Sequence, residues 1–237
     1  MARTVSLNKR FNRGVPARAY IKHLHVYTEG EITEKEYLNA FCREIIPVHP
    51  EFRLSIKPSK GKSSPRKILD AMRRDAKLFG DKRSNEIWVL IDQDDWPASH
   101  VEELKEGKGI RQAVSIYKVL QSIPKFELWV LLHFEKANGI STSKEIDEKL
   151  KTIIQNYNKH LPDNLFTWSN VQEAISNARL RVRNGHAAQT QVYELIEHLL
   201  ELAPTMTDTT PSATTFSSPR SKHPIGWFAY YLSQQIG

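Results

Sequence analysis

The stretch 86–95 constrains the fold of this chain most, because it joins five consecutive apolar residues to a group of carboxylates. The apolar run, residues 87–91, contains β-branched and aromatic side chains, which is typical of a strand buried on both faces. In open α/β sheets, ligands bind beyond the carboxyl ends of such strands. We therefore expect a ligand-binding edge where the acidic side chains follow, at Asp92, Asp94 and Asp95.

The spacing of these carboxylates favours a cation. Asp92 and Asp94 are two positions apart, so a continuing strand would point both the same way, while Asp95 would point elsewhere. Two carboxylates that face the same space repel each other unless a proton or a cation lies between them. Oxygen ligands suit Mg²⁺ or Mn²⁺. The alternative is an acidic loop that only caps the following turn at Trp96.

Strand and helix patterns alternate along the first part of the chain, which predicts an α/β fold with a mostly parallel sheet flanked by helices. Strands are expected at residues 20–28, 52–56, 86–91 and 118–122. Helices are expected at residues 34–45, 65–79, 126–134, 143–158, 169–184 and 189–202. Thr33 and Glu36 have the spacing of a capping box, and Ser64 before Pro65 has the pattern of a helix start.

Composition divides the chain into five parts. They are a basic N-terminal arm (1–19), an α/β core (20–135), a C-terminal helical extension (136–203), a flexible linker rich in Thr, Ser and Pro (204–224) and an aromatic segment (225–237). So aromatic a segment is expected to dock on this chain or on another one, as in a homo-oligomer.

Charge and cysteine content limit the function classes. The formal net charge of +7 favours an anionic partner such as nucleic acid. The single cysteine, Cys42, excludes an intramolecular disulfide and a cysteine-rich zinc site. No apolar run is long enough to cross a membrane, and the basic N-terminus lacks the apolar core of a signal peptide. We therefore expect a cytoplasmic protein without a membrane partner.

Three longer segments resemble one known family. Glu29-Gly-Glu-Ile-Thr-Glu-Lys-Glu-Tyr37, Trp88-Val-Leu-Ile-Asp-Gln-Asp94 and Ser122-Ile-Pro-Lys-Phe-Glu-Leu-Trp-Val-Leu-Leu-His-Phe134 are similar to the motifs of the RloB-like family. Ile123 departs from the pattern, which usually has Asn there. The resemblance implies a Toprim-like fold, since a glutamate after one strand and Asp-x-Asp after another is typical of Toprim domains. It also implies a metal-dependent nuclease of prokaryotic anti-phage defence or abortive infection, with an AAA/ABC-type ATPase (RloA-like) as partner.

The resemblance also implies the site. Asp92 and Asp94 would hold Mg²⁺ (or Mn²⁺), and Glu29 would be a third ligand or the general acid/base, so these three are the expected catalytic and metal residues. Glu34, Asp95 and Glu127 are expected around them, and Glu127 could instead face only the start of its own helix.

Two basic groups are candidates for contact with nucleic acid. They are Lys57, Lys60, Lys62, Arg66 and Lys67 in one stretch and Arg179, Arg181 and Arg183 in another. The alternative function is a non-catalytic nucleic-acid- or nucleotide-binding effector that keeps the Toprim fold and uses its carboxylates structurally.

Overall fold

The structure is a computed structural model that describes residues 21–46, 52–59, 64–93 and 96–203, all within one compact unit. Several sequence predictions lie outside these residues. They concern the basic arm, the linker, the aromatic segment and the side chains of Lys60, Lys62, Asp94 and Asp95.

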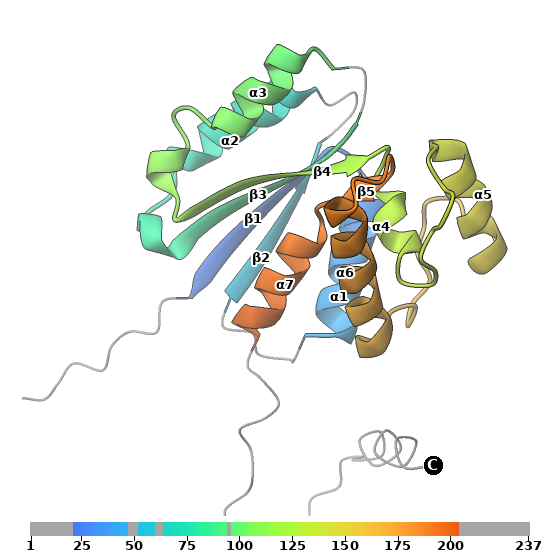
Figure 1. Cartoon of the computed structure of the whole chain (residues 1–237). Coiled ribbons are helices and arrows are strands. Elements are labelled where there is room, and N and C mark those ends of the chain that lie inside the picture. Colours follow the sequence, from blue (N-terminus) through green and yellow to red (C-terminus); the bar gives the residue numbers. More distant parts are fainter. Residues whose placement is uncertain (1–20, 47–51, 60–63, 94–95, 204–237) are drawn as a thin grey trace, which may run out of the picture. The chain divides into compact units, whose positions relative to one another are not determined.

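A mostly parallel sheet forms the centre of the described chain (Figure 1). Its strands are β1 Lys22–Thr28, β2 Phe52–Pro58, β3 Asn85–Asp92, β4 Ile116–Ile123 and β5 Gln189–Thr190. They lie in the order β2-β1-β3-β4-β5, with parallel pairing throughout except between β4 and β5, which are antiparallel. The predicted α/β class with a mostly parallel sheet is therefore confirmed.

Helices cover both faces of the sheet (Figure 1). Their bounds are α1 Thr33–Glu44, α2 Pro65–Ala76, α3 Ala98–Glu106, α4 Glu127–Leu131, α5 Ser143–Ile153, α6 Trp168–Arg183 and α7 Tyr193–Leu202. Short 3-10 helices lie at Lys82–Ser84 and Arg111–Ala113. The helices after residue 136 form the expected C-terminal helical extension.

The central strand β3 shows why its apolar run is continuous. Trp88 and Leu90 belong to the hydrophobic core shared with α1, α4, α6 and α7. Ile87, Val89 and Ile91 belong to a second core shared with α2 and α3. Because successive side chains of a strand point to opposite faces, a strand covered on both faces is apolar at every position.

Local signals at helix starts were right in one case and wrong in another. Ser64 caps α2 as predicted, because its Oγ accepts a hydrogen bond from the Lys67 N–H at 3.4 Å. The capping box at Thr33 and Glu36 is wrong, since α1 has Ile32 as its N-cap residue and no side-chain cap. Glu36 instead accepts a hydrogen bond from the Leu161 N–H at 2.7 Å.

The structure corrects the prediction of one uninterrupted helix at residues 189–202. Gln189 and Thr190 form the edge strand β5, and the helix starts only at Tyr193. The Ser122 and Thr190 hydroxyl groups lie 2.8 Å apart across this pairing. The C-terminal extension therefore contributes a strand to the sheet as well as helices.

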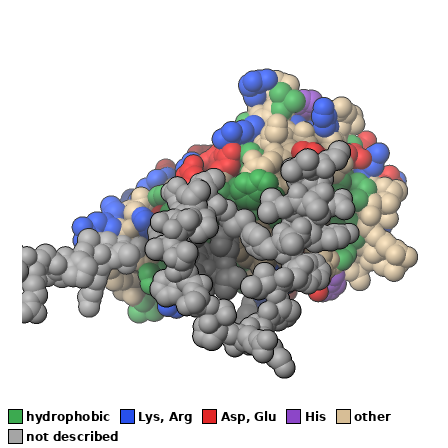
Figure 2. Space-filling view, turned by 90° about the horizontal axis from the view of Figure 1, so that it is seen from below, with side chains coloured by type: hydrophobic (Ala, Val, Ile, Leu, Met, Phe, Trp, Pro, Cys, Tyr) green, Lys and Arg blue, Asp and Glu red, His purple; other side chains and the backbone are tan. Residues whose placement is uncertain are grey.

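The surface of the described part is mixed in charge. On the face that Figure 2 draws, Lys and Arg side chains lie next to groups of Asp and Glu side chains. Among the residues that the structure describes, no helix has the length and apolar character needed to span a bilayer.

Candidate active site

The topology creates a crevice at the carboxyl ends of β1 and β3. From β1 the chain passes through α1 to β2 on one side, whereas β3 and β4 lie on the other side. The connecting helices change face accordingly, with α1 in one core and α2 and α3 in the other. Ligands of α/β proteins bind at such a reversal of strand order. Glu29 directly follows β1 and Asp92 is the last residue of β3, so both lie at this point.

Glu29 connects the two strand ends. One oxygen of its carboxylate, Oε2, accepts a hydrogen bond from the Asp92 N–H at 3.1 Å. The other, Oε1, accepts one from the Trp96 Nε1–H at 3.0 Å. Its own N–H donates to the Leu90 carbonyl at 3.0 Å. The structure thus brings Glu29 and Asp92 together, although they are far apart in the sequence.

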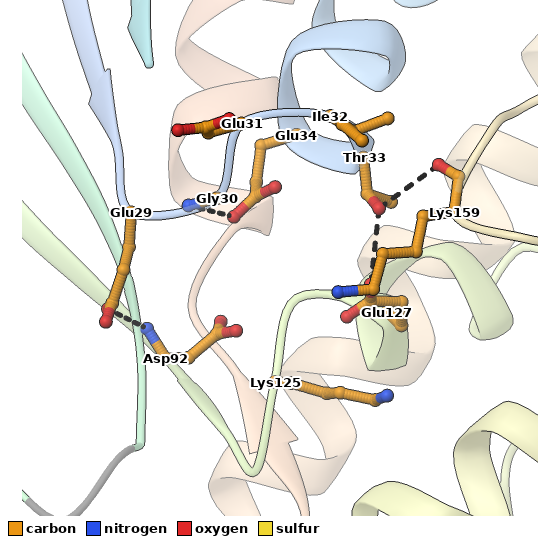
Figure 3. A pocket seen from close by; sticks show the side chains of 10 residues that line it. All are labelled: Glu29, Gly30, Glu31, Ile32, Thr33, Glu34, Asp92, Lys125, Glu127 and Lys159. Carbon is orange, nitrogen blue, oxygen red and sulfur yellow. Dashed lines mark hydrogen bonds between the residues drawn. The ribbon is translucent and has the colours of Figure 1, made fainter. Parts of the chain in front are cut away.

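A pocket of about 470 Å³ opens beside this connection (Figure 3). The carboxylates of Glu34, Asp92 and Glu127 face the same space within it. Its lining consists of Glu29, Gly30, Glu31, Ile32, Thr33, Glu34, Asp92, Lys125, Glu127 and Lys159. Segments from four separate parts of the chain therefore build one strongly acidic pocket.

Glu34 is held by the turn that follows β1. Its Oε1 accepts a hydrogen bond from the Gly30 N–H at 2.9 Å, and the residue is only 5% exposed. A Cβ atom at position 30 would collide with the Glu34 carboxylate, so a larger residue there would displace this side chain from its present place. Glu34 therefore both closes the turn and supplies a carboxylate to the pocket.

Glu127 lies both at the start of its own helix and in the lining of the acidic pocket. It lies in the first turn of α4, and it is 6% exposed with its carboxylate in the pocket. The Thr33 hydroxyl lies 3.2 Å from Glu127 Oε1 and 3.2 Å from the Lys159 carbonyl oxygen (Figure 3). Thr33 thus joins the start of α1, α4 and the loop that carries Lys159.

The electrostatics of the pocket favour a bound positive charge. Burial, followed by the charges of Glu34, Glu127 and Glu29, raises the pKa of Asp92 to about 8. Burial and the charge of Glu127 likewise raise the pKa of Glu34. At neutral pH the Asp92 carboxyl group therefore holds a proton unless a cation takes its place.

Two lysines in the pocket were not predicted from the sequence. Lys125 pairs with Asp147 on α5, and Lys159 extends its side chain toward Glu127 (Figure 3). Lys159 has a φ of 78°, which is rare for a residue other than glycine. Its carbonyl bond to Thr33 holds this conformation. A positive φ at a lysine leaves no signature in the amino-acid sequence. Sequence patterns alone could therefore not have placed Lys159 in this pocket.

The arrangement of donors differs from a ready-made metal site. In the described part of the chain, no three His, Cys, Asp or Glu side chains are grouped closely enough to hold an ion. Asp94 and Asp95, two of the expected acidic residues, lie outside that part. The side-chain groups of the pocket lining that could ligate a metal ion are nevertheless all oxygens, and carboxylates outnumber lysines there. This chemistry fits Mg²⁺ or Mn²⁺ once side chains turn toward the ion.

The second basic group does not form one surface. Arg181 is 3% exposed, and its guanidinium donates to the carbonyl oxygens of Lys136, Ala137, Ile140 and Ala188. The prediction that Arg181 contacts nucleic acid is therefore wrong, since it holds the chain segments around α6 together. Arg179 pairs with Glu197, and Arg183 is exposed at the end of α6.

In the first basic group, three residues lie in the described part of the chain. Lys57 pairs with Asp75, and Arg66 lies 3.7 Å from Glu103. Lys67 is exposed in the first turn of α2. Lys57 and Lys67 line a second pocket of about 290 Å³.

Comparison with known proteins identifies one family. The model of the family described as RloB-like protein matches residues 24–199. No curated protein and no solved structure matches the chain. The matched region contains Glu29, Glu34, Asp92 and Glu127, the four carboxylates described above, and extends into α7.

Proposed function

Because the chain belongs to the RloB-like protein family, we propose that it is a Mg²⁺- or Mn²⁺-dependent endonuclease of prokaryotic anti-phage defence. It would hydrolyse phosphodiester bonds of RNA, including tRNA, or of DNA. One observation carries the proposal, namely that the carboxylates of Glu34, Asp92 and Glu127 face one pocket beside Glu29, where burial and the charges of the other three residues raise the pKa of Asp92 to about 8. So much negative charge in one pocket is stable only with protons or a cation.

Glu29, Asp92 and Asp94 would hold the ion, with Glu34, Asp95 and Glu127 around them. When bound, Mg²⁺ supplies charge neutralisation on the phosphate and a water of lowered pKa. This order of Glu after one strand and Asp-x-Asp after another is the reason for proposing a Toprim-type site. A carboxylate oxygen can accept a hydrogen bond and also bind an ion, so Glu29 could serve as a ligand or as general acid/base while keeping its bonds from Asp92 and Trp96.

The remaining pocket residues would orient the reaction. The Thr33 hydroxyl fixes Glu127 relative to the loop of Lys159. Lys125 and Lys159 are the cationic side chains of the pocket lining, so they would contact the non-bridging oxygens of the phosphate. Their charges also offset part of the repulsion between the carboxylates and a polyanionic substrate.

Control of such an activity would come from outside this chain. We propose an AAA/ABC-type ATPase of the RloA-like type as the partner, on the strength of the family. A free nuclease would damage the cell's own nucleic acid, which makes regulated release the expected mode of action.

A second function is supported by the contacts of Glu29. Both oxygens of its carboxylate already accept hydrogen bonds that join β1, β3 and the segment at Trp96. A side chain used in this way can be structural, as in a non-catalytic nucleic-acid- or nucleotide-binding effector with the same fold.

A cleavage assay separates the two functions. The wild-type chain, with and without the ATPase, is incubated with plasmid, single-stranded DNA, RNA and tRNA in Mg²⁺, Mn²⁺ or EDTA. The endonuclease proposal predicts metal-dependent cleavage that falls at least about 100-fold in Asp92→Asn and Glu29→Gln. Asp163→Asn, which removes an exposed carboxylate outside the pocket, is the matched control. Equal cleavage by all four proteins, or no cleavage by any, would support the effector.

A further inference from the structure

The second pocket lies at the same edge of the sheet as the acidic pocket. Its lining comes from the end of β1, the end of β2 and α2, and consists of Tyr27, Lys57, Pro58, Ser59, Lys67, Ile68, Ala71, Arg74 and Asp75. The Ser59 N–H donates to the Thr28 carbonyl at 3.0 Å, directly before Glu29. The segment after β2 is therefore bonded to the strand end that supplies the acidic pocket.

The charges of this pocket are opposite to those of its neighbour. Three cationic side chains, Lys57, Lys67 and Arg74, share it with one carboxylate, Asp75. That carboxylate is engaged, since Oδ2 accepts hydrogen bonds from the Tyr27 hydroxyl at 2.6 Å and from Lys57 Nζ. Lys57 Nζ also lies 5.3 Å from the centre of the Tyr27 ring. Asp75 and Tyr27 thus hold one ammonium group in a fixed place, and Lys67 and Arg74 add further positive charge.

The position of Lys67 gives an independent reason to expect an anion. The first turn of α2 contains Arg66 and Lys67 and no acidic residue. Cations are unfavourable there, because the helix dipole places partial positive charge at the N-terminus. The first turns of α1, α4, α5 and α7 contain an acidic residue, and those of α3 and α6 contain neither Lys nor Arg. Departures from such local rules are expected at functional sites, and an anion in the pocket would interact favourably with the cations at this helix start.

We propose that this basic pocket binds a phosphate group of the nucleic-acid strand, next to the phosphate that lies in the acidic pocket. The proposal rests on the proposed function and specifies how its substrate is held. The acidic pocket repels a polyanion, so a substrate strand needs a cationic site nearby to stay at this edge. Phosphate contacts of this kind position a strand without reading its sequence.

Binding without metal tests the proposal separately from cleavage. Fluorescence anisotropy of a labelled oligonucleotide is measured in EDTA over a range of NaCl concentrations. The double variant Lys67→Ala/Arg74→Ala should bind the oligonucleotide at least about tenfold more weakly. The slope of log affinity against log NaCl concentration should be smaller by about one to two, which corresponds to the loss of one to two phosphate contacts. Lys144→Ala/Lys151→Ala, which removes two exposed cations of α5, is the control for lost net charge.

The outcomes decide between the pocket and its alternatives. Equal loss of affinity in both double variants, or no salt-dependent binding by the wild type, would overturn the proposal. Complete displacement of the oligonucleotide by millimolar AMP or inorganic phosphate would assign the pocket to a free phosphate compound instead. If wild-type protein binds but does not cleave in Mg²⁺, the nuclease proposal fails while the pocket stands. Both substituted side chains are exposed, and circular dichroism with the single variant Arg74→Ala checks that folding is intact.

Discussion

Replacing Asp92 by Asn should stabilise the metal-free protein, and the gain should grow with pH. Burial and the charges of Glu34, Glu127 and Glu29 raise the pKa of Asp92 to about 8 in the folded protein. An unfolded chain releases this proton near pH about 3.9. The stability conferred by the proton is therefore fully present below about pH 4 and is lost as the pH rises through 8. Asn does not titrate, so the variant keeps its stability.

The size of the effect follows from this one proton. Between the two pKa values, the free energy of unfolding of the wild type falls by about 1.4 kcal/mol per pH unit relative to the variant. From pH 5.5 to pH 7.5 the variant should therefore gain about 3 kcal/mol over the wild type. In a domain of this size that corresponds to roughly 6–12 °C in melting temperature.

Urea unfolding in EDTA at pH 5.5, 6.5 and 7.5 measures this difference directly. Glu173→Gln, which removes an exposed carboxylate of α6, is the control for the loss of one negative charge. The reasoning is refuted if the stability curves of wild type and Asp92→Asn run parallel over this pH range.

Two further predictions concern residues outside the pocket. Arg181→Ala should lower the free energy of unfolding by about 3 kcal/mol or more, because it leaves buried carbonyl oxygens without donors. Arg179→Ala removes only a surface ion pair and should cost less than about 1 kcal/mol; similar costs in chemical denaturation would contradict this assignment. Burial raises the pKa of the Cys42 thiol to about 11, so native protein at pH 8 should react slowly with iodoacetamide and unfolded protein rapidly. Equal rates in the two states would show that the thiol is accessible.

Sequence patterns predicted well those parts of the fold that depend on neighbouring residues. The continuous apolar run of β3 and the Ser64-Pro65 start of α2 are local patterns, and both were read correctly. The short strand β5 has only two residues, so its pairing with β4 rather than its own composition defines it. Similarly, Glu36 has no capping role, and its carboxylate instead accepts a hydrogen bond from a distant segment, at Leu161.

In the candidate site, too, residues placed by local patterns were predicted, and residues placed by contacts between distant segments were not. Glu29 and Asp92 could be placed at one sheet edge because each follows a predicted strand, and parallel strands end at the same edge. Lys159 and Thr33 could not be placed, since their contact joins segments that are distant in sequence. Arg181 was misread because charge alone does not reveal whether a guanidinium meets solvent or buried carbonyl oxygens.

The most direct test of the metal site is the binding of Mn²⁺ to the full chain at pH 8.5, followed by electron paramagnetic resonance. The account predicts saturable binding by the wild type that weakens at least about tenfold in Asp92→Asn and in Glu29→Gln, with Asp163→Asn unchanged. Wild-type protein that binds no Mn²⁺, or three variants that bind it equally well, would contradict the account.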